Sequence, residues 1–254
     1  MTSDVILAFK IFYNKVSDTD TNRKDIRLVM KTQPIDDNGT DLPAVIKALC
    51  PELVDKIIFH EERISTEEMG ILYNCCDTVI NIASNEGWGL SSTEGMMTGR
   101  TLINNVTGGL QDQCRFENEN GDWINFNKDF ASNHTGRYKN HGQWVKPIFP
   151  SSINLQGSLA TPYIFDDRCD IRKVAEAMMF WYETSPSELE ACGLSGREWA
   201  MSSESNFTAA KMCASFSNAL NTLLKFWTPP KQFQLYNTKK EIQKHNKNNL
   251  GICL

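Results

Sequence analysis

The chain has 254 residues, which is long enough to bury one large core or two small ones. Its net charge is −5 and charged residues make up 22% of the sequence, so the field of the whole protein does not favour nucleic acid or an anionic membrane as a partner. No stretch of about 18 uncharged apolar residues occurs, and Asp4 and Lys10 interrupt the first apolar run. We therefore expect no nucleic acid partner, no membrane span, no signal peptide and a cytoplasmic location.

Short apolar segments alternate with helical patterns over the first half of the chain. A helix is predicted for residues 5–16, where apolar residues recur at helical spacing. Four segments rich in β-branched residues are predicted strands: 26–30, 56–59, 78–82 and 101–103. Helical patterns lie between and after them at 42–49, 66–75 and 91–98. Ser65 and Glu68 have the spacing of a capping box at the start of the second of these helices. The alternation predicts an α/β fold with a doubly wound, mainly parallel sheet.

The second half of the chain has a different pattern. Residues 113–161 are rich in Asn, Gly and aromatic side chains but contain only short strand-like pieces, such as DWINF and QWVKP. Because aromatic side chains favour burial, we expect this segment to be an ordered excursion, such as a lid. Residues 163–165 are expected to return to the sheet, and three helices are predicted at 171–182, 186–201 and 207–226. Residues 228–254 form a predicted polar, lysine-rich tail, which leaves 1–227 as one domain.

The cysteines and histidines lack the spacing of a metal site or a disulfide framework. Eight cysteines are scattered along the chain without a CxxC pair, and Cys75 and Cys76 are adjacent. The four histidines form no HExxH motif and no Cys/His ligand set. We therefore expect reduced thiols and no bound metal.

The stretch SNEGWGLSSTEGMMTG, residues 84–99, is the strongest candidate for a binding site. It forms a turn between the third predicted strand and the next helix, at the sheet edge where open α/β folds bind ligands. Gly87 and Gly89 allow the backbone to approach a ligand, and the helix N-terminus that follows suits a phosphate or pyrophosphate. Glu86 and Glu94 suit the hydroxyl groups of a sugar and a ribose, because carboxylates accept hydrogen bonds. The stretch predicts a nucleotide-sugar site.

A second glycine turn, Gly108-Gly109, follows the next predicted strand and comes to the same sheet edge. Together with Glu86-GWGLSST-Glu94, the following EGMMTGRTLINNVTGG and the preceding ISTEEMGILYNCCDTVIN, it resembles the nucleotide-sugar-binding C-terminal half of a GT-B glycosyltransferase, most like glycosyltransferase family 4. The resemblance covers residues 1–226. It implies a Rossmann-like half with C-terminal helices. The implied function is transfer of a sugar, with retention of configuration, from a nucleoside-diphosphate sugar to an unidentified acceptor.

The resemblance also implies roles for the matching residues. Glu86, at the catalytic centre, would orient the transferred sugar without acting as an acid or base, and Glu94 would hold the ribose hydroxyls. The turn would bind the sugar and the diphosphate, the second glycine pair would line the neighbouring wall, and the nucleobase would lie by the segment after strand 56–59. The residues of the turn are Gly87, Trp88, Gly89, Leu90 and Ser91. The second glycine pair is Gly108 and Gly109, and the segment by the nucleobase contains Glu62, Arg63 and Ile64. No cofactor besides the donor substrate is implied.

The sequence departs from the family before its first helix. The family has there a strand with an Arg and a Lys that neutralise the departing diphosphate, and an acceptor-binding domain further upstream. We therefore expect the isolated chain to be an incomplete, inactive hexosyltransferase-like enzyme that needs an N-terminal half. Lys10 and Lys31 are candidate substitutes for the missing cations. Two alternatives stay open: a degenerate nucleotide-sugar-binding module that serves a partner chain, and a GT-B-type epimerase or phosphorylase-like enzyme.

Overall fold

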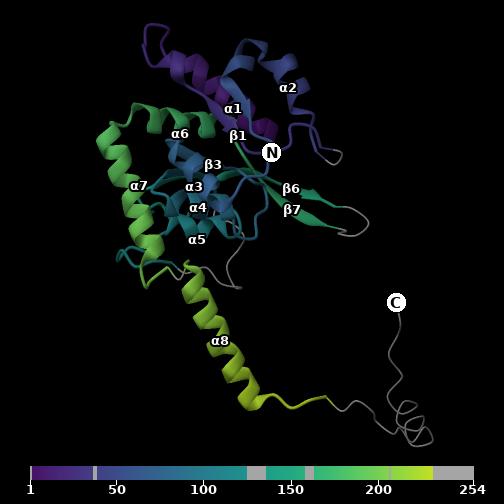
Figure 1. The fold of residues 1–254 in the computed structure, drawn as a ribbon, viewed down its shortest axis with the longest axis vertical. Coiled ribbons are helices and arrows are strands. Elements are labelled where there is room, and N and C mark those ends of the chain that lie inside the picture. The colour runs from purple at the N-terminus through teal and green to yellow at the C-terminus, as the bar shows by residue number, and fades with distance from the viewer. Residues whose placement is uncertain (1, 37–38, 125–135, 158–162, 206, 231–254) are drawn as a thin grey trace, which may run out of the picture. The chain divides into compact units, whose positions relative to one another are not determined.

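Parallel strands form the centre of the first of two units (Figure 1). The computed structural model describes residues 2–36, 39–124, 136–157, 163–205 and 207–230. The chain divides into compact units of residues 1–208 and 209–254. Most of the predicted tail lies outside the described residues, and the domain of residues 1–227 stays a prediction.

The strands occur where β-branched residues cluster, and they pair in parallel. Strands β1 (Leu28–Met30) and β2 (Ile57–Phe59) form one pair, while β3 (Thr78–Asn81), β4 (Thr101–Asn105) and β5 (Val145–Ile148) form a second sheet in the order β3-β4-β5. The four predicted strands are therefore confirmed. The piece QWVKP, which had no assigned partner, contributes β5 and pairs with β4.

Each predicted helix has a counterpart in the structure. The helices are α1 (Thr2–Lys15), α2 (Leu42–Leu49), α3 (Thr66–Asn74), α4 (Leu90–Met97), α5 (Leu110–Cys114), α6 (Ile171–Glu183), α7 (Pro186–Met201) and α8 (Ala209–Phe226), with short 3₁₀ helices at Arg23–Asp25 and Pro51–Lys56. Among the α-helices of the described residues, only α5 lacks a predicted equivalent, because it is a short helix that begins directly after the second glycine turn.

Helices cover both faces of the sheet that contains β4. Ile103 belongs to a hydrophobic cluster with residues of α1 and α6, whereas the preceding Leu102 belongs to a cluster with Met96 of α4 and Trp199 of α7. Successive side chains of a strand point to opposite faces, so the two clusters lie on opposite sides of the sheet. This arrangement confirms the predicted doubly wound α/β class.

Strands β6 (Pro150–Gln156) and β7 (Ile164–Cys169) form an antiparallel hairpin, which projects from the sheets in Figure 1. The expectation that residues 163–165 return to the parallel sheet is wrong, because Ile164 and Phe165 pair with β6. β6 is led by proline and is largely polar, so residue preferences did not indicate a partner strand at this position. At the base of the hairpin, the Asp167 N–H donates to Ser84 O at 2.8 Å, which ties it to the loop after β3.

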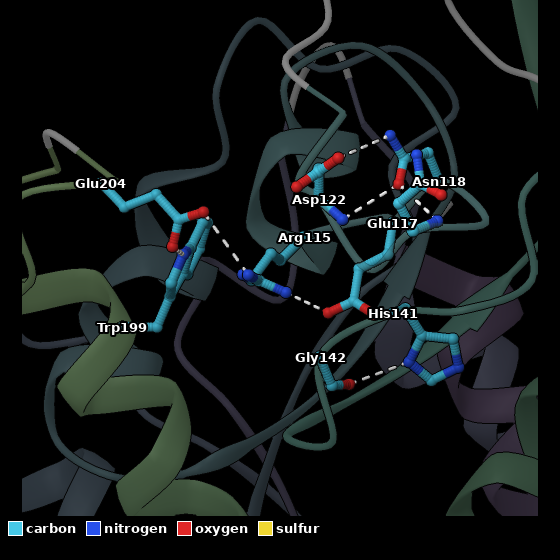
Figure 2. Close-up of polar contacts among 9 residues, drawn as sticks. Arg115, Glu117, Asn118, Asp122, His141, Gly142, Trp199 and Glu204 are labelled. Carbon is cyan, nitrogen blue, oxygen red and sulfur yellow. Dashed lines mark hydrogen bonds and ion pairs between the residues drawn. The ribbon is translucent and has the colours of Figure 1, made fainter.

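The segment predicted as an excursion, 113–161, contains β5 and β6, and its residues 125–135 and 158–161 lie outside the described part. Arg115 follows α5 and forms ion pairs with Glu117 and, at 3.4 Å, with Glu204 (Figure 2). Trp199 Nε1 donates to the second oxygen of Glu204 at 3.1 Å. These contacts fasten the start of the segment to the end of α7.

The capping box predicted for α3 is confirmed. Ser65 Oγ accepts from the Glu68 N–H at 3.2 Å, and Glu68 Oε2 accepts from the Ser65 N–H at 2.8 Å. We predict that Ser65→Ala lowers the free energy of unfolding by about 1 kcal/mol, because an amide of the first turn loses its partner. Urea denaturation measures the change. Thr66→Ala, at the adjacent exposed position, is the control, and equal losses in the two variants would contradict a capping effect.

Candidate functional site

The glycine stretch forms the turn between β3 and α4, at the carboxyl edge of the parallel sheet. Gly89 starts α4 with a φ of +84°, a left-handed conformation that favours glycine, and no side chain caps this helix. The amides of Ser92 and Thr93 both donate to Gly89 O. In the described part of the chain no group accepts from the preceding amides, those of Leu90 and Ser91. This helix N-terminus therefore offers N–H groups and a partial positive charge to an anion.

The second glycine turn packs directly on the first. The Gly109 N–H donates to Glu86 O at 3.1 Å. Gly108 has a φ of +48°, and a Cβ at this position would overlap Glu86 O. A Cβ on Gly109 would lie 2.7 Å from Trp88 Cα. Both glycines are thus required by close backbone packing, which sets the position of the turn from Glu86 to Trp88.

A buried glutamine that sequence analysis did not identify holds the turn from the protein interior. Gln113, at the end of α5, is fully buried. Its Nε2 lies 2.6 Å from Trp88 O, 3.1 Å from Gly89 O and 3.0 Å from Thr93 Oγ1, and donates to all three. One side chain therefore fixes both the glycine turn and the first turn of α4.

The same glutamine belongs to a larger buried network. Asn104 of β4 donates to Gln113 Oε1 at 3.3 Å and accepts from Ser92 Oγ at 2.9 Å. Trp144 Nε1 donates to the Gln113 carbonyl oxygen at 3.0 Å. A satisfied polar network in a low-dielectric interior is rigid, so the N-terminus of α4 is held against the sheet and α5.

The two carboxylates of the motif have different surroundings. Glu86 is half-buried in the turn, whereas Glu94 is exposed on α4. Tyr73 of α3 donates from its hydroxyl to Glu94 Oε2 at 2.9 Å. Burial, with the nearby Glu94 carboxylate, raises the pKa of Tyr73, so the phenol stays protonated and remains a donor at neutral pH. Tyr73 thereby orients Glu94, a role that no sequence spacing indicated.

Solved structures share this fold, whereas no family model and no curated protein matches the sequence. Two of them are sucrose-phosphate synthase from Thermosynechococcus elongatus, with a TM-score of 0.54 at 16% identity, and HepE from Anabaena in complex with UDP and glucose, with a TM-score of 0.50 at 12% identity. The chain has the fold of one half of a GT-B glycosyltransferase. The alignments cover 88% and 87% of this chain but 42% and 53% of those proteins, so the chain spans about half of their length. The predicted GT-B half is confirmed as a fold, and membership of family 4 stays a prediction.

The segment predicted to lie by the nucleobase follows β2 in this GT-B half. Glu62 and Arg63 are exposed, and Ile64 is half-buried. Lys31, at the end of β1, donates from Nζ to Glu62 O at 2.6 Å, which joins the chain after β1 to the chain after β2. The base-binding role of these residues stays a prediction.

The two candidate cations are already engaged elsewhere. Lys10 donates to Leu49 O at the end of α2 and lies 3.7 Å from Glu52, and Lys31 holds the carbonyl of Glu62. These contacts stabilise the fold and argue against either lysine as a substitute for the diphosphate-neutralising residues. Within the described residues, no group of three His, Cys, Asp or Glu side chains is arranged to bind a metal, and no helix is long and apolar enough to cross a membrane.

Proposed function

We propose that this GT-B half binds the donor of a retaining glycosyltransferase of family 4, a nucleoside-diphosphate sugar. The observation that carries the proposal is the turn before α4, which runs at the sheet edge from Glu86, held by the second glycine turn, to the amides of Leu90 and Ser91, whose N–H groups have no acceptor among the described residues. Glu94 follows near the middle of α4. HepE, a neighbour of the same fold, was solved with UDP and glucose, which supports this ligand class.

The proposed roles follow from the groups that each position offers. The amides of Leu90 and Ser91, with the partial positive charge of α4, bind the diphosphate and stabilise the charge that it gains on departure, at about 3 kcal/mol for each well-placed donor. Glu94 accepts hydrogen bonds from the ribose hydroxyls, and Glu86 accepts them from the sugar. Both carboxylates orient the donor without acting as an acid or base.

In the proposed reaction the bond between the sugar C1 and the diphosphate oxygen breaks, and a bond forms between C1 and an acceptor oxygen. The acceptor hydroxyl passes its proton to the departing diphosphate oxygen, and the nucleoside diphosphate leaves. We propose that an N-terminal GT-B half, in the same protein or a partner, supplies the acceptor site and the basic residues, because Lys10 and Lys31 are engaged elsewhere. The reaction needs no cofactor beyond the donor, and a cytoplasmic location stays a prediction.

The same observation on the lysines favours a second candidate function. A chain that presents amides and hydroxyl-binding carboxylates, but whose candidate cations are occupied, suits a module that binds a nucleotide sugar without transferring it. The two functions are distinguished by mixing the chain with an acceptor-binding half and measuring the free nucleoside diphosphate that is released. A transferase releases it, whereas a binding module releases none.

The test of donor binding is calorimetric titration of the chain with UDP, GDP, ADP and their sugar conjugates. We predict that one nucleotide family binds and that Glu94→Gln weakens its binding at least about tenfold, because charge-assisted hydrogen bonds to the ribose are lost. Glu67→Gln, an exposed glutamate on α3 outside the site, is the matched control. The proposal is wrong if none of these nucleotides binds or if both variants weaken binding equally.

A further inference from the structure

A pocket of about 350 Å³ lies between β5 and α6, within the unit of residues 1–208. Its described lining residues include none from the turn before α4 or from the second glycine turn. The volume is at the lower end of the range of small-molecule sites, about 300 to 1,000 Å³. One wall is formed by β5 with the residue after it and the other by one face of α6, and most of the lining side chains are apolar. The first wall contains Lys146, Pro147, Ile148 and Phe149, and the second contains Lys173, Glu176, Ala177 and Phe180.

Lys146 is the charged residue of the β5 wall. It lies opposite Ile103 in the parallel register of β4 and β5, so its side chain points to the face of the sheet that α6 covers. Its Nζ lies 3.2 Å from the centroid of the Phe180 ring and 5.8 Å from that of Trp181. Among the described residues, no oxygen accepts a hydrogen bond from this ammonium and no carboxylate pairs with it. The half-buried cation is thus held by aromatic rings and has N–H groups to donate to a ligand.

The other two charges of the pocket cancel one another. Lys173 Nζ lies 2.9 Å from Glu176 Oε2, and both side chains are exposed. The described lining therefore has two lysines and one glutamate, a net charge of +1 that Lys146 supplies. Burial lowers the pKa of Lys146 because it disfavours the charged form, and an anion beside the ammonium would offset that cost. The pocket therefore favours a ligand with a single negative charge.

The apolar walls define the rest of the ligand. Phe180 is 45% exposed, and a ligand with an apolar body would remove its ring from water. A phosphate group would instead bring a second negative charge near Glu176, and Pro147 has no N–H to bind it. We propose that this pocket binds a small organic acid, a monocarboxylate whose carboxylate pairs with Lys146 and whose apolar body packs on Phe180. This site is independent of the nucleotide-sugar site.

The experiment is titration of the full chain with 3-phenylpropionate, with binding measured by saturation-transfer NMR. We expect a Kd below about 1 mM. The neutral 3-phenylpropionamide keeps the size of the probe without its charge, and inorganic phosphate keeps a negative charge without the apolar body. Both should bind at least about tenfold more weakly than the acid. Equal binding of the acid and the amide by the parent chain would show that the ammonium does not select the ligand, and would overturn the proposal.

Variants assign the binding to this pocket. Lys146→Met keeps the apolar stem and removes the charge, so it should weaken binding of 3-phenylpropionate at least about tenfold. Lys146→Arg keeps a cation that stacks on aromatic rings and should bind within about threefold of the parent chain. Lys47→Met, at an exposed position of α2, is the matched control and should bind like the parent chain. Melting temperatures verify that each variant is folded. The proposal is refuted if the parent chain does not bind the acid, or if Lys146→Met and Lys47→Met bind it equally.

Discussion

Gly108→Ala should lower the free energy of unfolding by about 3 kcal/mol or more. The added Cβ would overlap Glu86 O, which is backbone and cannot rotate away, and the φ of +48° disfavours any L side chain. Either the two glycine turns separate or the turn before α4 moves. Urea denaturation measures the stability, and the titration with nucleotides measures whether the turn still binds its ligand.

Variants of two further glycines separate the two causes of this loss, which are the overlap of the added Cβ with Glu86 O and the positive φ. Gly121 has a φ of +83° with open space around its Cβ position, so Gly121→Ala reports the backbone conformation alone and should lose about 1 kcal/mol. Gly87 has neither a positive φ nor a neighbour within 4 Å, so Gly87→Ala should change stability by less than about 0.5 kcal/mol. If Gly108→Ala loses no more than Gly121→Ala, the close packing of the two turns is not what requires glycine at this position.

The local part of the fold could be predicted because it depends on nearby residues. Runs of β-branched residues predicted strands β1 to β4, and apolar residues at helical spacing predicted the helices between them. The end of β4 was missed, since Asn104 and Asn105 are residues typical of turns. In the structure Asn105 is buried and its Nδ2 donates to Ala83 O at 2.8 Å and Asp167 O at 2.9 Å. Tertiary hydrogen bonds override the residue preference here.

The non-local pairings could not be predicted. β5 pairs with β4 across about forty residues of sequence, and β7 pairs with a polar strand that has no alternation of apolar residues. The candidate site likewise has a local part that the sequence predicted and a non-local part that it did not. The turn was recognisable because a strand, glycines and a helix are adjacent in sequence, but the residues that fix it, Tyr73 and Gln113, come from other helices and have no spacing relative to the turn.

Gln113→Met should lower the free energy of unfolding by about 3 kcal/mol. The substitution keeps most of the volume and removes the donor, so the buried carbonyls of Trp88 and Gly89 and the Asn104 amide lose partners. Gln143→Met, at an exposed position, changes the same atoms in water and should alter stability by less than about 0.5 kcal/mol. Urea denaturation of the two variants makes the comparison, and similar stabilities would show that the network does not hold the turn.

Gln113→Glu tests whether the donor is the essential part of this side chain. The variant keeps the shape and an oxygen for Asn104, but it directs a second oxygen at the carbonyls of Trp88 and Gly89. A carboxyl buried against two carbonyl oxygens has a raised pKa in the folded state, because its charged form is desolvated and repelled. Its folded form is then favoured when protonated, so the variant should lose stability as the pH rises from about 4 to about 8 relative to the parent chain. A loss that is constant over this pH range would mean that the new carboxyl group turns to solvent, and that the turn before α4 is stable without a donor at this position.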